Sequence, residues 1–141
     1  MLFRSIKMSV TINKTITRFK DLNLLFTRHP ITDDVTVKTD VEAVKFSIKN
    51  LILTRHYEVP FHPEVGTSIV GRLFENYTPV TRNLIEEEIR NVITNYEPRA
   101  ELLGVNFSGS PMKNSMTIEV VFRMINVTEP ITLSIVLERT R

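Results

Sequence analysis

The sequence predicts an α+β domain in which helices pack on one face of a small antiparallel C-terminal sheet. Two patterns predict this fold: apolar residues recur at helical spacing between residues 40 and 96, and from Glu101 onward they alternate with a period of two. A chain of 141 residues is long enough to bury one hydrophobic core. We therefore expect a basic N-terminal arm at residues 1–20 and a single domain at residues 21–141.

The predicted arm differs in charge from the rest of the chain. Residues 1–20 have a net charge of +5 and no acidic residue, whereas the remainder has a net charge of −3. Val10, Ile12 and Ile16 alternate with polar residues, as in an exposed strand or arm. A solvated tail is the favoured interpretation, ahead of a transit peptide or a phosphate-binding arm.

The composition argues against several function classes. Cysteine is absent, which rules out a disulfide framework, a thiolate zinc site and a cysteine nucleophile, and which fits a reducing compartment. No apolar run approaches the roughly 18 residues of a membrane helix, so we expect no membrane insertion. The net charge of +2 is too small to indicate specific nucleic-acid binding.

The first helix is predicted to run from Asp40 to Thr54. Thr39 can cap it, and Glu42 would complete a capping box. The preceding segment, Asp21–Asp34, is predicted to be a loop because Pro30 forces the residue before it out of helical geometry. The core face of the helix is expected to carry Val41, Val44, Ile48, Leu51 and Ile52.

A connector and a short helix are predicted next. The prolines at 60 and 63 favour an extended, stiff connector over Arg55–Pro63. The short helix is expected to begin at Pro63 and to be weakened by Gly66 and Gly71. Its apolar stripe comprises Ile69, Val70, Leu73 and Phe74.

The longest helix is predicted to begin near Pro79 and to end at about Tyr96, because Pro98 disfavours helical geometry at the residue before it. The residues expected to face water are Arg82, Glu86, Glu87 and Arg90. The residues expected to face the core are Leu84, Ile85, Ile89, Val92, Ile93 and Tyr96.

Three strands are predicted to follow as a meander, with turns at residues 108–115 and 126–130. One face of the resulting sheet should be apolar. The residues expected on that face are Leu103, Val105 and Phe107 in the first strand, Ile118, Val120, Phe122 and Met124 in the second, and Ile131, Leu133, Ile135 and Leu137 in the third.

Catalytic and metal-binding patterns are not found in the sequence. The consecutive carboxylates Glu86–Glu88 point in different directions on a helix, which indicates a solvated face and not the paired carboxylates of a glycoside hydrolase. His29, His56 and His62 lie in predicted loops without metal-site spacing. Binding is therefore favoured over catalysis, and no cofactor is expected.

The segment Glu97-Pro98-Arg99 is the candidate site, because it lies between the longest helix and the sheet. In the extended geometry that proline favours, Glu97 and Arg99 project to the same side and hold a carboxylate beside a guanidinium. The planar guanidinium could bind carbonyl or carboxylate groups of a partner. It could equally form an internal pair that closes the helix, and the residues alone do not decide between the two.

The order and spacing of several segments resemble the baseplate wedge protein family of contractile tails. This family includes the gene-25 product of T-even-type phages and subunits of type VI secretion baseplates. The resemblance extends from about Phe26 to Leu137. The segments that carry it are residues 26–35, 50–54, 59–69, 73–75 and 97–99.

The resemblance implies a non-enzymatic structural subunit of a virion tail baseplate, assembled in the host cytoplasm. It implies that Glu97, Pro98 and Arg99 contact the helical core bundle of larger wedge proteins. It also implies that the C-terminal sheet accepts strands from tail sheath subunits and so starts sheath growth. Tail tube or central baseplate proteins are further possible partners. The residues of the expected template strands are Ile118, Val120, Phe122, Ile131, Leu133, Ile135 and Leu137.

Two alternatives belong to other function classes. A peptidoglycan-degrading, lysozyme-like enzyme is suggested by the glutamate-rich helix and by the lysozyme label that some family members carry. A nucleic-acid-binding module is suggested by the basic first twenty residues.

Overall fold

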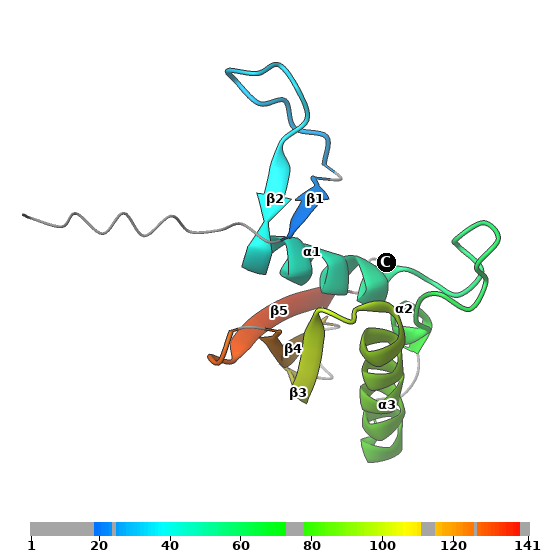
Figure 1. Ribbon diagram of the computed structural model, residues 1–141. Coiled ribbons are helices and arrows are strands. Elements are labelled where there is room, and N and C mark those ends of the chain that lie inside the picture. Colours follow the sequence, from blue (N-terminus) through cyan, green and yellow to red (C-terminus); the bar gives the residue numbers. More distant parts are fainter. Residues whose placement is uncertain (1–18, 24, 73–77, 111–114, 126, 139–141) are drawn as a thin grey trace, which may run out of the picture.

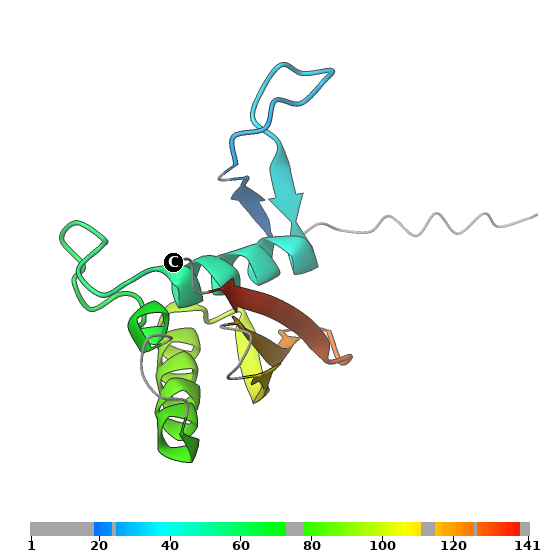
Figure 2. The same ribbon diagram turned by 180° about the vertical axis from the view of Figure 1, so that it is seen from behind.

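The computed structural model describes residues 19–23, 25–72, 78–110, 115–125 and 127–138 (Figure 1). It confirms the α+β prediction: β3, β4 and β5 form an antiparallel sheet in that order, and α1 and α3 pack on one face of it (Figures 1 and 2). The elements in chain order are β1 (Lys20–Leu22), β2 (Val37–Thr39), α1 (Asp40–Leu53), α2 (Ile69–Arg72), α3 (Pro79–Tyr96), β3 (Ala100–Ser110), β4 (Ser115–Met124) and β5 (Ile131–Glu138).

The segment Asp21–Asp34, predicted to be a loop, lies mostly in the loop of a β-hairpin, and only its first two residues belong to a strand, β1. Strand β1 pairs antiparallel with β2, and Arg28 forms an isolated bridge with Val35. The hairpin stands away from the sheet (Figure 1). Three-residue strands are too short for an alternating pattern to reveal them in a sequence. The boundary between arm and domain stays a prediction, because residues 1–18 lie outside the described part of the chain.

Helix α1 begins where predicted, but its start is stabilised differently. Thr39 makes no side-chain capping bond, so the predicted capping box with Glu42 is wrong. Instead, the Asp40 carboxylate accepts a hydrogen bond from Phe19 N at 3.2 Å, and Asp40 N donates to Phe19 O at 2.9 Å. The helix start is therefore tied to the residue that precedes β1.

The segment after α1 is a compact loop and not the predicted extended connector. Tyr57 N donates to Pro63 O at 3.1 Å, which folds the chain back on itself. Tyr57 and Phe61 both have a φ of 68°, a left-handed conformation that proline spacing does not reveal. The short helix begins only at Ile69, six residues later than predicted. Leu73 and Phe74 of its predicted stripe lie outside the described residues.

Gly66 allows this loop to return to α1. Its φ is +117°, and a Cβ at this position would lie 2.6 Å from the carbonyl oxygen of Thr54. The next residue, Thr67, is buried and donates through its hydroxyl to Ile52 O at 2.6 Å. The prediction that Gly66 weakens a helix is therefore wrong. Glycine is required at this position because the loop backbone passes close to the backbone of Thr54.

Helix α3 begins and ends close to the predicted residues. Thr78 caps it by accepting a hydrogen bond from Thr81 N at 3.2 Å. Leu84 was predicted to face the core but is 44% exposed, because it lies at the margin of the helix's apolar stripe. The fully or nearly fully buried apolar residues of α3 are Ile85, Ile89, Val92 and Ile93.

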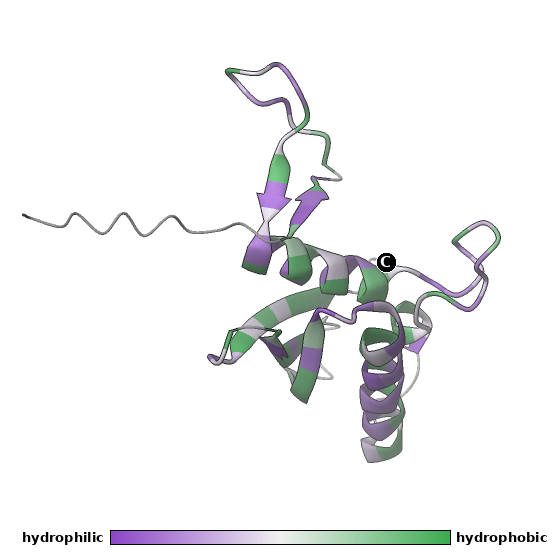
Figure 3. Cartoon of the chain, in the orientation of Figure 1, coloured by the Kyte–Doolittle hydropathy of each residue, from purple (hydrophilic) through white to green (hydrophobic). Residues whose placement is uncertain are grey.

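The strands of the sheet alternate between hydrophobic and hydrophilic residues (Figure 3). The prediction for the second strand is confirmed: Ile118, Val120, Phe122 and Met124 are all buried. In β3 the register shifts between Leu102 and Gly104, which is a β-bulge. Leu103, predicted to face the core, is consequently exposed, while Leu102 packs against the core.

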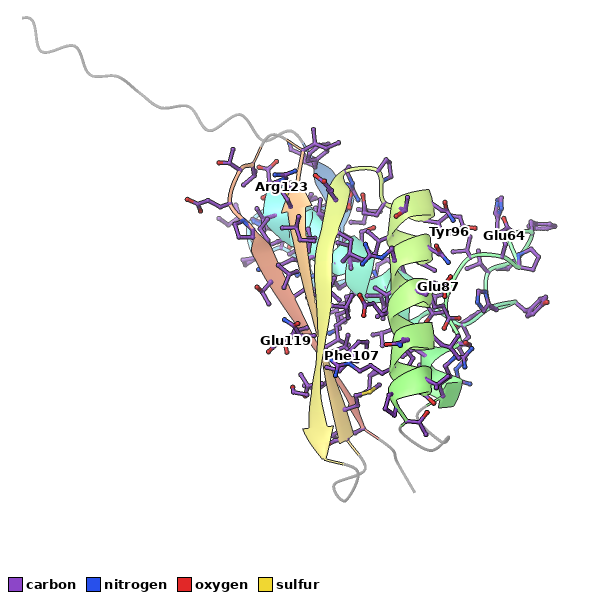
Figure 4. All side chains as sticks on the ribbon, turned by 90° about the horizontal axis from the view of Figure 1, so that it is seen from below. Glu64, Glu87, Tyr96, Phe107, Glu119 and Arg123 are labelled. Carbon is purple, nitrogen blue, oxygen red and sulfur yellow. The ribbon has the colours of Figure 1, made fainter. Side chains whose placement is uncertain are left out.

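The core fills the space between the helices and the sheet. In Figure 4, Phe107 lies on the face of the sheet toward α3, and Glu119 and Arg123 lie on the opposite face. The largest fully buried side chain of the core is that of Phe122. The core therefore joins α1, α3 and the sheet into the platform that carries the candidate site.

Gly66, in the loop before α2, and Gly71, within α2, make a matched pair of positions for testing this loop. We expect Gly66→Ala to lower the free energy of unfolding by about 1–3 kcal/mol, because it adds a Cβ against backbone at a left-handed φ. Gly71→Ala should leave stability unchanged or raise it by up to about 1 kcal/mol, since nothing lies within 4 Å of its Cβ. Urea unfolding followed by circular dichroism measures both, and equal effects would contradict the role of Gly66.

Candidate partner-binding site

Glu97 and Arg99 form a closely bonded pair at the corner between α3 and β3. Arg99 Nε donates to Glu97 Oε1 at 2.6 Å, and Nη2 donates to Glu97 Oε2 at 2.8 Å. The prediction that the two side chains project to the same side is confirmed. Glu97 also ends the helix, because its backbone N–H donates to Ile93 O at 2.9 Å.

Asp21 of β1 is a third member of this corner, and sequence reasoning missed it. Arg99 Nη1 and Nη2 donate to the two carboxylate oxygens of Asp21 at 3.1 and 3.0 Å. The guanidinium also lies 5.5 Å from the ring centroid of Phe19. Asp21 is 78 residues from Arg99 in the chain, so no local pattern could have identified the contact.

The electrostatics of the corner keep both charges in place. Burial raises the pKa of the Glu97 carboxyl, but hydrogen bonds from Arg99 and Ser47 and the charge of Arg99 outweigh it, so the net pKa is lowered. Hydrogen bonds from Glu97 and Asp21 raise the pKa of Arg99 above its already high value. Glu97 and Arg99 are therefore both charged at neutral pH.

The corner offers only part of these groups to a partner. Glu97 is 2% exposed, whereas the Arg99 side chain is 23% exposed. The bonds to Glu97 and Asp21 use four of the five guanidinium N–H groups. Pro98 is exposed. The surface of the corner therefore consists of Pro98 and the outer edge of Arg99, with Glu97 supporting them from below.

The sheet provides a second candidate surface at its edges. Strand β4 pairs with both neighbours, so its residues Ile118, Val120 and Phe122 form the middle of the platform. The edges are β3 and β5. The bulge at Leu103 interrupts β3, and such irregularities hinder pairing with another chain. Strand β5 has no bulge and pairs with β4 over all eight of its residues.

Strand β5 has few of the features that protect an edge. No lysine or proline occurs between Ile131 and Glu138. Within the described residues, the backbone bonds of β5 all go to β4. Helix α1 lies beside the strand (Figures 1 and 2), and Ile135 and Leu137 are buried while Ile131 and Leu133 are only partly buried. The core therefore covers the second half of β5 more completely than the first.

Glu88 is not part of a solvated helix face, contrary to the prediction. Its carboxylate accepts hydrogen bonds from Ser68 N at 2.8 Å and from Ser68 Oγ at 2.7 Å. His56 Nε2 lies 3.3 Å and Arg72 Nε 3.6 Å from the carboxylate oxygens. The cluster connects the loop and α2 to α3. Its bonds are those of a structural clamp.

The described part of the chain contains no group of three or more His, Cys, Asp or Glu residues that could hold a metal ion. His62 lies 3.2 Å from Glu64 in an exposed pair, and His29 accepts hydrogen bonds from Ile31 N and Thr32 N at 3.3 Å within its turn, through Nδ1. Across the same residues, no helix is long and apolar enough to cross a membrane.

Comparison with known proteins identifies the family. The model of the family described as baseplate wedge protein gp25 matches residues 38–128. The chain belongs to this family. The match includes the corner at residues 97–99 and ends before β5, and it begins after β1. The predicted family resemblance is therefore confirmed.

Relatives of this family agree with the assignment. Baseplate wedge protein gp25 of Enterobacteria phage T4 is 34% identical over 93 residues, which are 66% of this chain and 70% of the phage protein. A crystal structure from Geobacter sulfurreducens, provisionally named a tail lysozyme, is 25% identical with a TM-score of 0.61 and covers 70% of this chain and 89% of that one. In the cryo-EM baseplate of the anti-feeding prophage, one chain is 22% identical with a TM-score of 0.61, covering 84% of this chain and 83% of that one. This last similarity supports the fold.

The buried carboxylate predicts a pH dependence of stability. The lowered pKa of folded Glu97 means that its contribution to stability is present above the unfolded value of 4.5 and is lost as pH falls through the folded pKa. We expect the free energy of unfolding to fall more steeply in the wild type than in Glu97→Gln between about pH 6 and about pH 3. Glu87→Gln, which changes an exposed glutamate on α3, is the control and should follow the wild type (Figure 4). Parallel pH profiles for wild type and Glu97→Gln would show that Glu97 does not titrate as inferred.

Proposed function

We propose that this chain is a structural subunit of a contractile-tail baseplate wedge that starts sheath growth. Its corner at Glu97, Pro98 and Arg99 binds the helical core bundle of larger wedge proteins. Its C-terminal sheet, through β5, pairs with strands of the first sheath subunits. The chain acts in the virion tail baseplate and is assembled in the host cytoplasm. Membership of the baseplate wedge family supports the first part of this proposal.

The observation that carries the sheath proposal is the regular edge of β5. An antiparallel edge strand has a row of N–H and C=O groups directed away from its sheet, and a strand from another chain can satisfy them. The outward side chains of this edge, Thr132, Ser134 and Val136, are small or β-branched and favour strand pairing. A head-to-tail contact of this kind does not close on itself, so subunits added above it would continue as a helical tube.

The corner supports a role in binding because it is rigid. Glu97 and Asp21 hold the guanidinium of Arg99 in one orientation, so little conformational freedom would be lost when a partner binds. Replacing Arg99 with Ala would leave the carboxylate of Glu97 buried without its main partner, which costs roughly 3 kcal/mol. An assembly defect in that variant would thus mix lost binding with lost stability, and the edge of β5 allows a cleaner test.

The absence of cysteine allows this edge to be blocked chemically. Ser134→Cys on β5 and Ser108→Cys on β3 each create a single thiol at an exposed position on opposite edges of the sheet. Baseplates assembled without the wild-type chain are supplied with each variant, either unmodified or coupled to a polyethylene glycol maleimide. Electron microscopy then counts the baseplates that carry a sheath.

We expect both unmodified variants and the polymer-coupled residue 108 variant to support sheath growth. The polymer at residue 134 should reduce the number of sheathed baseplates by about tenfold or more, because it blocks the approach of a partner strand. Sheaths of normal number and length on baseplates with the polymer at residue 134 would sink the proposal. Loss of sheath with both polymers would place the contact elsewhere on the sheet.

An enzymatic function is the second candidate, because a structural neighbour is named a tail lysozyme and Glu88 is largely shielded from solvent. We expect the purified chain to release no soluble fragments from fluorescently labelled peptidoglycan, since the groups around Glu88 are those of a clamp. Turnover that disappears in Glu88→Gln but persists in Glu87→Gln would overturn this expectation.

A further inference from the structure

The outer edge of β5, which faces away from β4, has no partner among the described residues. Strand β5 pairs with β4 over all eight of its residues, and its other side is the margin of the sheet. Proteins usually protect such an edge with a lysine, a proline, a bulge or a charge that points inward. Strand β5 has none of these, since its inward side chains are all apolar. A chain that left this edge bare before assembly would be prone to wrong pairing.

The described chain begins at the end of the sheet where β5 begins. The ring of Phe19 lies 5.5 Å from the guanidinium of Arg99, and Arg99 O accepts a hydrogen bond from Ile125 N at 3.0 Å. Ile125 follows the last residue of β4, and β4 pairs through Phe122 with Ile131, the first residue of β5. Figures 1 and 2 show that β1, which follows Phe19, starts beside the first turn of α1, the helix that lies beside β5. The segment that precedes Phe19 is therefore attached near the start of β5.

The sequence of that segment matches both faces of β5. Within residues 9–16, Val10, Ile12 and Ile16 fall on one side of an extended chain, and serine, threonine and asparagine fall on the other. Strand β5 has the same division: its core side is apolar, and its outward residues are Thr132, Ser134 and Val136. A strand formed by residues 9–16 beside β5 would therefore extend the core on one face and the small polar surface on the other.

The length and direction of the segment also fit β5. An extended segment of eight residues spans about 27 Å, and β5 has the same number of residues. Because Phe19 lies near Ile131, a segment that runs back along β5 from Phe19 is antiparallel to it. Placing Ile16 opposite Ile131 puts every apolar residue of the segment opposite an apolar residue of β5. The same register places Asn13 opposite Ser134.

Two basic residues of the arm suit this position. Lys14 would lie opposite Leu133 on the core side of the new edge, where its charge would hinder the pairing of a further strand. This is the protection that β5 lacks. Arg18 would lie in the connection to Phe19, beside the start of β5. The exposed carboxylate of Glu129, which has no ion pair with any described residue, provides a counter-charge there.

We propose that residues 9–16 pair with β5 of the same chain as an antiparallel strand and occupy its edge until a sheath strand displaces them. The contact itself needs no other protein, whereas its consequence for sheath growth rests on the proposed function. The free chain is then a poor template, because sheath strands must first displace the arm. This role differs from the solvated tail that composition alone favours for the first twenty residues.

Paired cysteines test the contact in the full-length chain, which has no cysteine of its own. Ser134→Cys on β5 is combined in turn with Thr11→Cys, Asn13→Cys and Thr15→Cys, which share the outward side of the proposed strand. A disulfide forms readily only when the two Cα atoms lie within about 7 Å, so one of the three pairs should fit the register. Ser108→Cys on β3, combined with the same three positions, is the matched control on the opposite edge.

Mild oxidation of the dilute protein is followed by non-reducing electrophoresis and by mass spectrometry of the linked peptides. We expect the pair at residues 13 and 134 to close within one chain about tenfold faster or more than every pair with residue 108. The same preference centred on residue 11 or 15 supports the pairing with a register shifted by two residues. Equal rates at residues 134 and 108 would overturn the proposal. Disulfides that join two chains would place the arm on a second copy and would overturn it too.

Amide exchange tests the same contact without cysteines. Ile12→Pro removes a backbone donor from the middle of the proposed strand, and Ile6→Pro makes the same change before that strand begins. We expect amide exchange in β5 to rise by about tenfold or more in Ile12→Pro and to stay at the wild-type rate in Ile6→Pro. Wild-type exchange in Ile12→Pro would count against the proposal, as would an equal rise in both variants.

Failure of this inference and failure of the sheath proposal give different results. The disulfide is measured on the isolated chain, whereas the polymer experiment counts sheaths on baseplates. A disulfide between residues 13 and 134, together with normal sheaths when the polymer is at residue 134, would refute the sheath proposal and leave the arm contact in place. Loss of sheaths with that polymer, without any preference for residue 134 in the disulfide experiment, would refute the arm contact alone.

Discussion

The arrangement of α3, the hairpin and the corner depends on the ion pairs of the Arg99 guanidinium. This group pairs with Glu97 at the end of α3 and with Asp21 in β1, and it lies over the ring of Phe19. A carboxylate as buried as that of Glu97 is stable only with such a partner, so the end of α3 and the corner depend on Arg99. The same pairing that stabilises the fold therefore orients the corner that we propose for the wedge contact.

The sheet separates this contact from the second proposed one. Strand β4 is paired on both sides and its apolar face is buried, so it acts as a rigid spacer between the edges. Because β3 has a bulge and β5 has none, the two edges of the sheet differ in how readily they can pair with a strand of another chain. The core between the two proposed contacts does not deform easily. A subunit that is fixed to the baseplate through one surface could therefore present a strand at the other in a defined register.

Much of the regular structure could be predicted, and the irregular parts could not. The residues of α3 and β4 follow their periodicities closely, except that Leu84 and Tyr96 of α3 were predicted to face the core and are not part of it. The compact loop after α1 depends on left-handed conformations at Tyr57 and Phe61, which ordinary propensities disfavour and only the surrounding contacts stabilise. Glu88 looked like a surface residue because its partners, Ser68 and His56, are distant in the chain.

The sequence by itself determined the fold class, the family resemblance and the projection of Glu97 and Arg99 to the same side, because each depends on residues close together or on a repeated local pattern. It did not determine that the two side chains bond to each other, which only the structure shows. The tertiary structure decided that Asp21 completes the corner, that a hairpin precedes α1, and that β5 is the regular edge. These features depend on which distant segments meet. Strand order and long-range ion pairs follow from the packing of the whole core, and a local pattern contains no record of it.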